Sequence, residues 1–340
     1  MQKEMKYQVC VKCMTYNQCD YIVHTLDGIA MQQTNFPFIC TVVDDASTDN
    51  NQKVILNYLN VHFDTDNSDV FYKNENDYAI IYFAQHKSNK HCFFSVLLLK
   101  NNHYCQKKSY LKDRYISEWR DNSKYVCTCE GDDYWTNPTR LQKMVDFLEE
   151  HPDYVVVNHR INRYYQATDE LKDDKSNDVF FGKAKGFTYG RYFNRFVHWT
   201  TQTIATVYRR EILEKSLSEY PYSKTDGILS YFPLKYGKGY CFNDYMATYR
   251  INDGGTYSRL SQVEKSYWNW KMFKDFDTYE KSFFSKLSYI EAYSRLLVQT
   301  KWKRYKDANF NIGIFLFTVI YVPLKKAITL YYKVRFVLQS

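Results

Sequence analysis

The stretch from Tyr125 to Trp135 constrains the fold more than any other part of the sequence. It opens with Tyr-Val-Cys-Thr-Cys, an uncharged run that favours a buried strand. Glu130-Gly131-Asp132-Asp133 follows at once, and a helical pattern then runs from Arg140 to Glu150. Acidic residues between a buried strand and a helix stand where open α/β sheets bind ligands. An acidic surface turn is the alternative, and this stretch alone does not decide between them.

Two other expected strands also end in polar motifs. Tyr7–Cys13 is followed by Thr15-Tyr16-Asn17, and Phe38–Val43 is followed by Asp44-Asp45-Ala46-Ser47-Thr48-Asp49. Strands and helical patterns alternate to about residue 160, which predicts a doubly wound, mainly parallel α/β sheet with helices on both faces.

The local patterns also predict the connecting elements. We expect a helix capped by Asp20 and running to about Gln33, a strand at Ala79–Phe83 and a helix around Phe93–Leu99. Residues 62–77 and 160–186 are polar or charged and are expected to form loops.

Together, the three polar motifs resemble those of the family 2 glycosyltransferases of the GT-A fold, over roughly residues 5–260. The resemblance implies an enzyme that moves a sugar from a nucleotide-sugar to a hydroxyl by metal-assisted single displacement, with inversion at the anomeric carbon. It implies a GT-A catalytic domain over residues 1–260, with a nucleotide-sugar-binding half (1–135) and an acceptor half (136–260). Residues 261–340 would form a basic, aromatic, helical tail.

The resemblance places Thr15, Tyr16 and Asp45 in the nucleoside pocket. A carboxylate there can accept a hydrogen bond from the ring N–H of uracil or from ribose hydroxyls, which favours a UDP-sugar donor. Asp44 is expected either to orient its loop or to cap the following helix.

For the diphosphate side, the resemblance assigns Asp133 as a direct ligand of Mn²⁺ or Mg²⁺ and Asp132 as a contact of the ribose or the metal. Carboxylates plus substrate phosphates are the usual ligands of Mg²⁺. Because the family motif is Asp-any-Asp, Glu130 is an alternative contributor. Arg250 would contact the diphosphate, or it would form a structural ion pair.

The acceptor hydroxyl needs a base positioned at its proton. Asp226 lies in Ser-Lys-Thr-Asp-Gly-Ile-Leu, a segment that resembles the family's Asp at the start of a helix near the acceptor. Its alternative role is helix capping. Asp244 and Asp253 are the rival bases.

The C-terminal tail differs in charge from the rest of the chain. Residues 265–340 carry 14 Lys and Arg against 5 Asp and Glu, whereas the whole chain has a net charge of +8. Phe310–Leu324 is mostly apolar but shorter than the roughly 20 residues of a membrane-spanning helix. An interfacial helix on an anionic membrane surface fits this composition, and packing on the catalytic domain or against a second copy are the alternatives. No nucleic acid is expected as a partner.

The cysteines and the first residues suggest a compartment. Nine cysteines, several of them in expected buried strands, suggest reduced thiols. Cys10 and Cys13 form a CxxC motif, but positions three apart on a strand point to opposite faces, which disfavours a shared zinc ion. Met1–Lys6 shows no secretory signal. We therefore expect a cytoplasmic protein, with the tail offering attachment to the inner face of the cell membrane.

Two other functions compete with glycosyl transfer. A sugar-1-phosphate nucleotidyltransferase would carry a Gly-rich loop with a basic residue after the first strand, and Thr15-Tyr16-Asn17-Gln18 does not supply one. A non-catalytic glycan- or nucleic-acid-binding protein would not need both acidic pairs, but the basic tail leaves this alternative open. The expected acceptor is a cell-surface glycan or a lipid-linked precursor.

Overall fold

The computed structural model describes residues 6–175, 178, 181, 184–191, 202–222, 225–252, 254–255, 259–301, 303, 305–309 and isolated positions between 312 and 330. Its strands are β1 (Tyr7–Thr15), β2 (Phe38–Asp44), β3 (Phe71–Glu75), β4 (Ala79–Gln85), β5 (Cys92–Leu99), β6 (Ser123–Thr128), β7 (Tyr134–Trp135), β8 (Tyr154–Tyr165), β9 (Glu170–Asp173), β10 (Gly186–Tyr189), β11 (Thr206–Arg209) and β12 (Lys238–Ile251). Its helices are α1 (Ile22–Ala30), α2 (Asn51–His62), α3 (Ser109–Arg120), α4 (Arg140–Glu150), α6 (Arg210–Ser218), α7 (Asp226–Leu229), α8 (Gln262–Glu280) and α9 (Phe283–Gln299).

The strands form one sheet in the order β10-β12-β8-β11-β6-β1-β2-β5-β4-β3, with β7 paired to β12 and β9 to β8. The central strands β6, β1, β2 and β5 are parallel. Antiparallel strands flank this centre, because β4 pairs antiparallel with β5, and β11 with both β6 and β8. Every residue of β2 is buried, as expected for a parallel strand covered on both faces.

Helices cover both faces of the sheet. Apolar side chains of α1, α2 and α4 share one buried cluster with Val9, Val11 and Cys13 of β1. Side chains of α3 and α6 pack on the opposite face, with Tyr7 and Cys10. The predicted doubly wound α/β architecture is therefore confirmed, and Cys10 and Cys13 do point to opposite faces.

Several predicted elements are wrong. Phe93–Leu99 is not a helix but most of β5, hydrogen-bonded in parallel to β2. A continuous apolar run of this length fits a buried strand or a buried helix equally well, and the sheet partner decides. Residues 62–77 contain the edge strand β3, and β8 continues to Tyr165, into a segment expected to be irregular. Asp20 does not cap α1, whose N-cap is Tyr21.

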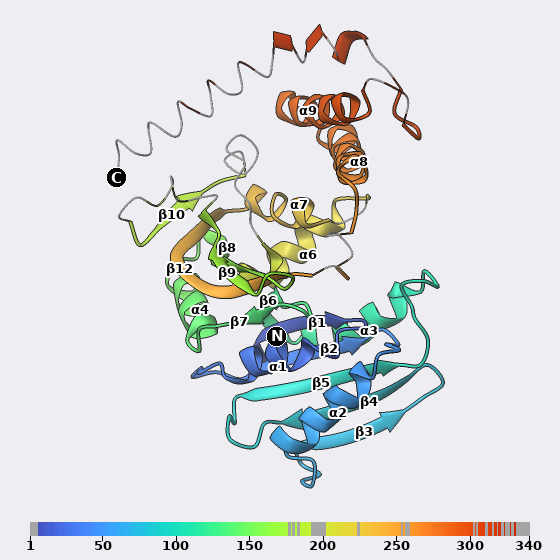
Figure 1. The fold of residues 1–340 in the computed structure, drawn as a ribbon. Coiled ribbons are helices and arrows are strands. Elements are labelled where there is room, and N and C mark those ends of the chain that lie inside the picture. The colour runs from blue at the N-terminus through green and yellow to red at the C-terminus, as the bar shows by residue number, and fades with distance from the viewer. Residues whose placement is uncertain are drawn as a thin grey trace.

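The helices of the tail form a hairpin. Figure 1 shows α8 and α9 beside each other beyond α7, at the end of the molecule away from β3. Tyr267 and Trp270 of α8 pack with Leu296 and Leu297 of α9 in a separate buried cluster. A capping box between Ser261 and Glu264 starts α8. Within the described residues, no helix has both the length and the apolar character needed to cross a membrane.

Candidate functional site

The acidic loop after β6 lies against the end of β1. The backbone N–H of Gly131 donates to the carbonyl of Met14 at 2.9 Å. A Cβ atom on residue 131 would come within 2.6 Å of Thr15 Oγ1, so only glycine fits this close approach. The glycine thus places Asp132 and Asp133 at the carboxyl edge of the central strands, beside Thr15.

The two aspartates have different surroundings. Asp133 is 3% exposed, and its Oδ1 accepts the backbone N–H of Arg250 at 2.8 Å. Burial raises the pKa of Asp133 well above its ordinary value, and repulsion by Asp132 and Glu130 adds to this. Asp132 is partly exposed, and its Oδ2 accepts from Asn252 Nδ2 at 3.0 Å. Asp132 is therefore the carboxylate that a ligand reaches more easily.

Arg250 joins β12 to the acidic loop. Its Nε donates to the carbonyl of Asp132 at 2.8 Å, its Nη1 to Gln166 Oε1 at 2.7 Å and its Nη2 to His24 Nδ1 at 3.2 Å. It is 5% exposed. A diphosphate could contact only those guanidinium N–H groups of Arg250 that these three hydrogen bonds do not use.

Asp45 lies just after β2, with its backbone N–H bonded to the carbonyl of Thr15 at 3.0 Å. Its buried carboxylate accepts the backbone N–H groups of His103 and Tyr104 at 2.8 and 3.1 Å, and Lys112 Nζ at 3.0 Å. Asp45 thus holds the segment 103–112 over the end of the sheet. No local pattern indicates Lys112 as the partner of Asp45, because the two residues are far apart in the chain.

Asp44, Thr15 and Tyr16, which lie beside Asp45, differ in how accessible they are to a ligand. Asp44 is fully buried and accepts from Ser47, Asn51 and Gln52, so it orients its own loop. Thr15 is also buried, but Tyr16 is 46% exposed at the same edge. Tyr16 is therefore free to contact a bound ring, whereas Asp44 is not.

Asp226 is the first residue of α7, and Thr225 is the N-cap. Its carboxylate is solvent-exposed, yet the protein atoms around it raise its pKa by desolvation. The pKa of Glu130 is raised to about 7, mainly by burial and secondly by the negative charge of Asp226. The fold therefore brings Asp226 within electrostatic reach of the acidic loop. Asp244 instead pairs with Lys143 at 2.8 Å, and Asp253 lies outside the described residues.

The acidic loop offers part of the ligand set that a divalent cation needs. The described residues contain no group of three or more His, Cys, Asp or Glu side chains arranged to hold a metal. The loop does offer the carboxylates of Asp132 and Asp133, and two buried oxygens, Glu130 Oε2 and Gln18 Oε1, have no hydrogen-bond donor among the residues that the structure describes. An incomplete set of oxygen ligands fits Mg²⁺ or Mn²⁺ bound jointly with a substrate diphosphate.

Known proteins with a similar sequence match only part of this chain. No protein-family model matches the sequence. Uncharacterised proteins from Mycobacterium bovis and Mycobacterium tuberculosis are 32% identical over 162 residues, which is 48% of this chain and 37% of each relative. The matched segment thus spans just over a third of those curated relatives.

Two solved structures extend the comparison to most of the chain. TarS from S. aureus in complex with UDP-GlcNAc is 15% identical, with a TM-score of 0.54 over 86% of this chain and 73% of that one. The mannosyltransferase PcManGT from Pyrobaculum calidifontis, in complex with GDP-Man and Mn²⁺, is 14% identical, with a TM-score of 0.52 over 98% and 87%. At such identities the likeness concerns architecture: this chain has the α/β fold found in TarS and in the mannosyltransferase.

Proposed function

We propose that the chain is an inverting glycosyltransferase of the family 2, GT-A type that transfers a sugar from a nucleotide-sugar to a hydroxyl group. One observation carries the proposal. Three polar strand ends lie side by side at one edge of the sheet, although they come from distant parts of the sequence. Asp226 is close enough to this edge for its charge to raise the pKa of Glu130 in the acidic loop. Ligands bind at this edge in open α/β folds, and both solved structures of similar fold hold a nucleotide-sugar.

In the proposed reaction the acceptor oxygen forms a bond to the anomeric carbon, and the bond from that carbon to the diphosphate breaks. The acceptor proton passes to Asp226, and the nucleoside diphosphate leaves. Such sugar transfers have oxocarbenium-like transition states. Asp226 is suited to the task because it is exposed and its raised pKa makes it a stronger base than an ordinary aspartate.

Asp132 and Asp133 would hold Mn²⁺ or Mg²⁺ together with the diphosphate, and the bound cation would neutralise charge on the leaving group. Thr15, Tyr16 and Asp45 would surround the nucleoside, with Arg250 behind the acidic loop. We take the donor to be UDP-linked and the acceptor to be a cell-surface glycan or a lipid-linked precursor, handled on the cytoplasmic side of the cell membrane.

A panel of UDP-, GDP- and dTDP-sugars tests this function. With Mn²⁺ and without acceptor, we expect slow release of nucleoside diphosphate from one UDP-sugar, and we expect EDTA to stop it. Incubation with UTP and sugar 1-phosphates is the control for nucleotidyl transfer, which would release pyrophosphate. Pyrophosphate from that control, or no metal-dependent release from any donor, would reject the proposal.

We also propose that the tail attaches the enzyme to anionic membrane. Ile312, Leu316, Val319 and Ile320 are helical, follow helical spacing and are each at least 58% exposed. The excess of basic residues in 265–340 would add attraction to acidic lipids. The full chain should sediment with phosphatidylserine vesicles at low salt and be released as the salt concentration rises. Equal sedimentation with neutral vesicles, or none with either kind, would contradict this attachment.

A further inference from the structure

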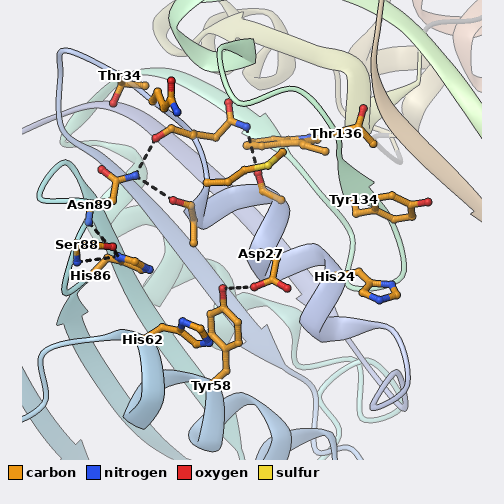
Figure 2. A pocket seen from close by; sticks show the side chains of 16 residues that line it. His24, Asp27, Thr34, Tyr58, His62, His86, Ser88, Asn89, Tyr134 and Thr136 are labelled. Carbon is orange, nitrogen blue, oxygen red and sulfur yellow. Dashed lines mark hydrogen bonds between the residues drawn. The ribbon is translucent and has the colours of Figure 1, made fainter.

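A groove of about 1060 Å³ lies along the outer side of α1, on the helical face that carries His24, Asp27, Gly28 and Met31. Figure 2 shows its surroundings: Tyr58 and His62 from α2, His86, Ser88 and Asn89 from the loop between β4 and β5, and Tyr134 and Thr136 on the opposite side. None of the residues proposed above to bind donor or metal lines it.

The lining limits the chemistry of a ligand. Its 16 residues include no lysine or arginine, so the groove offers no fixed positive charge to a phosphate or a nucleotide. Its carboxylate, Asp27, is exposed and disfavours anions. The described residues that line the groove also include no cluster of three or more His, Cys, Asp or Glu side chains arranged to hold a metal ion. An uncharged ligand suits this groove best.

The polar atoms are arranged as donors and acceptors beside flat rings. Asp27 Oδ1 accepts from Tyr58 at 2.8 Å, and its Oδ2 has no hydrogen-bond partner in the described part of the chain. His86 Nδ1 accepts the backbone N–H of Asn89 at 3.0 Å, which leaves Nε2 as a donor. Burial, followed by the charges of His62, Lys90 and Lys87, lowers the pKa of His86, so its ring is neutral at pH 7. The ring of His62 lies 6.2 Å from that of His86 and 4.4 Å from that of Tyr58.

One end of the groove touches the proposed active site. His24 accepts from Arg250 at 3.2 Å, and Arg250 also bonds the carbonyl of Asp132. Tyr134 directly follows Asp133 in the acidic loop. A chain-like ligand lying in the groove would therefore lead toward the edge of the sheet where transfer is proposed.

We propose that this groove binds neutral sugar units of the acceptor glycan. These units would lie behind the one whose hydroxyl receives the new sugar. Sugar rings present hydroxyl groups at their rims and C–H faces that pack on planar side chains, which matches Asp27, His62 and His86. The inference rests on the proposed glycosyl transfer, and it adds a second contact region that would select acceptors by the sugars behind their growing end.

The test uses the full chain on an array of neutral oligosaccharides of glucose, mannose, galactose and N-acetylglucosamine, with sialylated and sulfated members as charge controls. We expect binding to at least one neutral series. Asp27→Asn keeps an acceptor for Tyr58 but removes the charge, and His62→Ala removes a ring. Each should weaken that binding by about tenfold, the usual worth of one hydrogen bond to a charged group or a similar contact.

Asp146→Asn is the matched control, because Asp146 is an exposed carboxylate on α4 that does not line the groove. It should bind glycans like the parent chain. All three variants should keep the parental affinity for UDP. Loss of UDP binding would therefore indicate misfolding or a wrong proposed function, and it would not count against glycan binding in the groove. Binding to no neutral series, to acidic members only, or equally by the parent and both groove variants would overturn the inference. If light scattering showed that the parent chain is a dimer and that the groove substitutions dissociate it, the groove would be a contact between copies. That result would also overturn the inference.

Discussion

Asp226→Asn should lower the transfer rate by at least about a hundredfold while UDP affinity stays at the parental value. A positioned general base typically contributes a factor of this size. The amide is nearly isosteric with the carboxylate but cannot take up the acceptor proton. Rate measurements at saturating donor and acceptor, with calorimetry for UDP binding, separate the two effects.

The structure argues against capping as the role of Asp226. Thr225 occupies the N-cap position of α7, so Asp226 already lies within the helix. Asp244→Asn is the control variant, because that carboxylate pairs with Lys143 on the surface and should be dispensable for transfer. Near-parental turnover in Asp226→Asn would remove it as the base, and lost UDP affinity in a folded variant would move it to the donor site.

The pH profile should follow from the environment of Asp226. A base works only when deprotonated, and desolvation by the surrounding protein atoms raises the pKa of this carboxyl. Transfer should therefore decline on acidification at a pH above the ordinary range of aspartate.

Asp132→Asn and Asp133→Asn should each reduce UDP affinity in Mn²⁺ to the value measured in EDTA. An amide keeps one oxygen ligand but loses the negative charge that attracts a divalent cation. Calorimetric titration of UDP, with and without metal, gives the comparison directly.

Folding should survive the Asp133 substitution. The amide oxygen can still accept from the Arg250 backbone, and a neutral side chain avoids the desolvation cost that raises the pKa of Asp133. The thermal midpoint at pH 7 should thus equal or exceed that of the parent. If only Asp132→Asn loses the metal effect, Asp133 is a structural residue that shapes the loop, in line with its burial. If neither variant loses it, the acidic loop is not the metal site.

Much of the central fold could be predicted because its strands are continuous apolar runs that end in polar motifs. Tyr7–Cys13, Phe38–Val43 and Tyr125–Thr128 all lie in the parallel centre of the sheet. The strand β5 was harder, because Phe93–Leu99 is apolar on both faces and shows no period. The edge strand β3 has mostly exposed side chains, and no apolar pattern distinguishes it from a loop.

The candidate site was predictable as residue types but not as contacts. Acidic motifs at strand ends indicated Asp45, Asp132 and Asp133, yet their partners come from remote segments. Lys112 and the backbone of Arg250 reach these carboxylates only through the tertiary fold. The groove along α1 depends on four separate segments, so no local pattern could have indicated it.

The packing of α7 limits how such chains can be recombined. Thr225 Oγ1 contacts Met272 Sδ of α8 at 2.9 Å, and Ile228 shares a buried cluster with Phe276. The short helix that carries Asp226 therefore rests on a helix from the segment after residue 260. A chimaera that exchanged the first 260 residues between homologues would separate Asp226 from its support. Acceptor preference is better transplanted with α7, α8 and α9 as one unit.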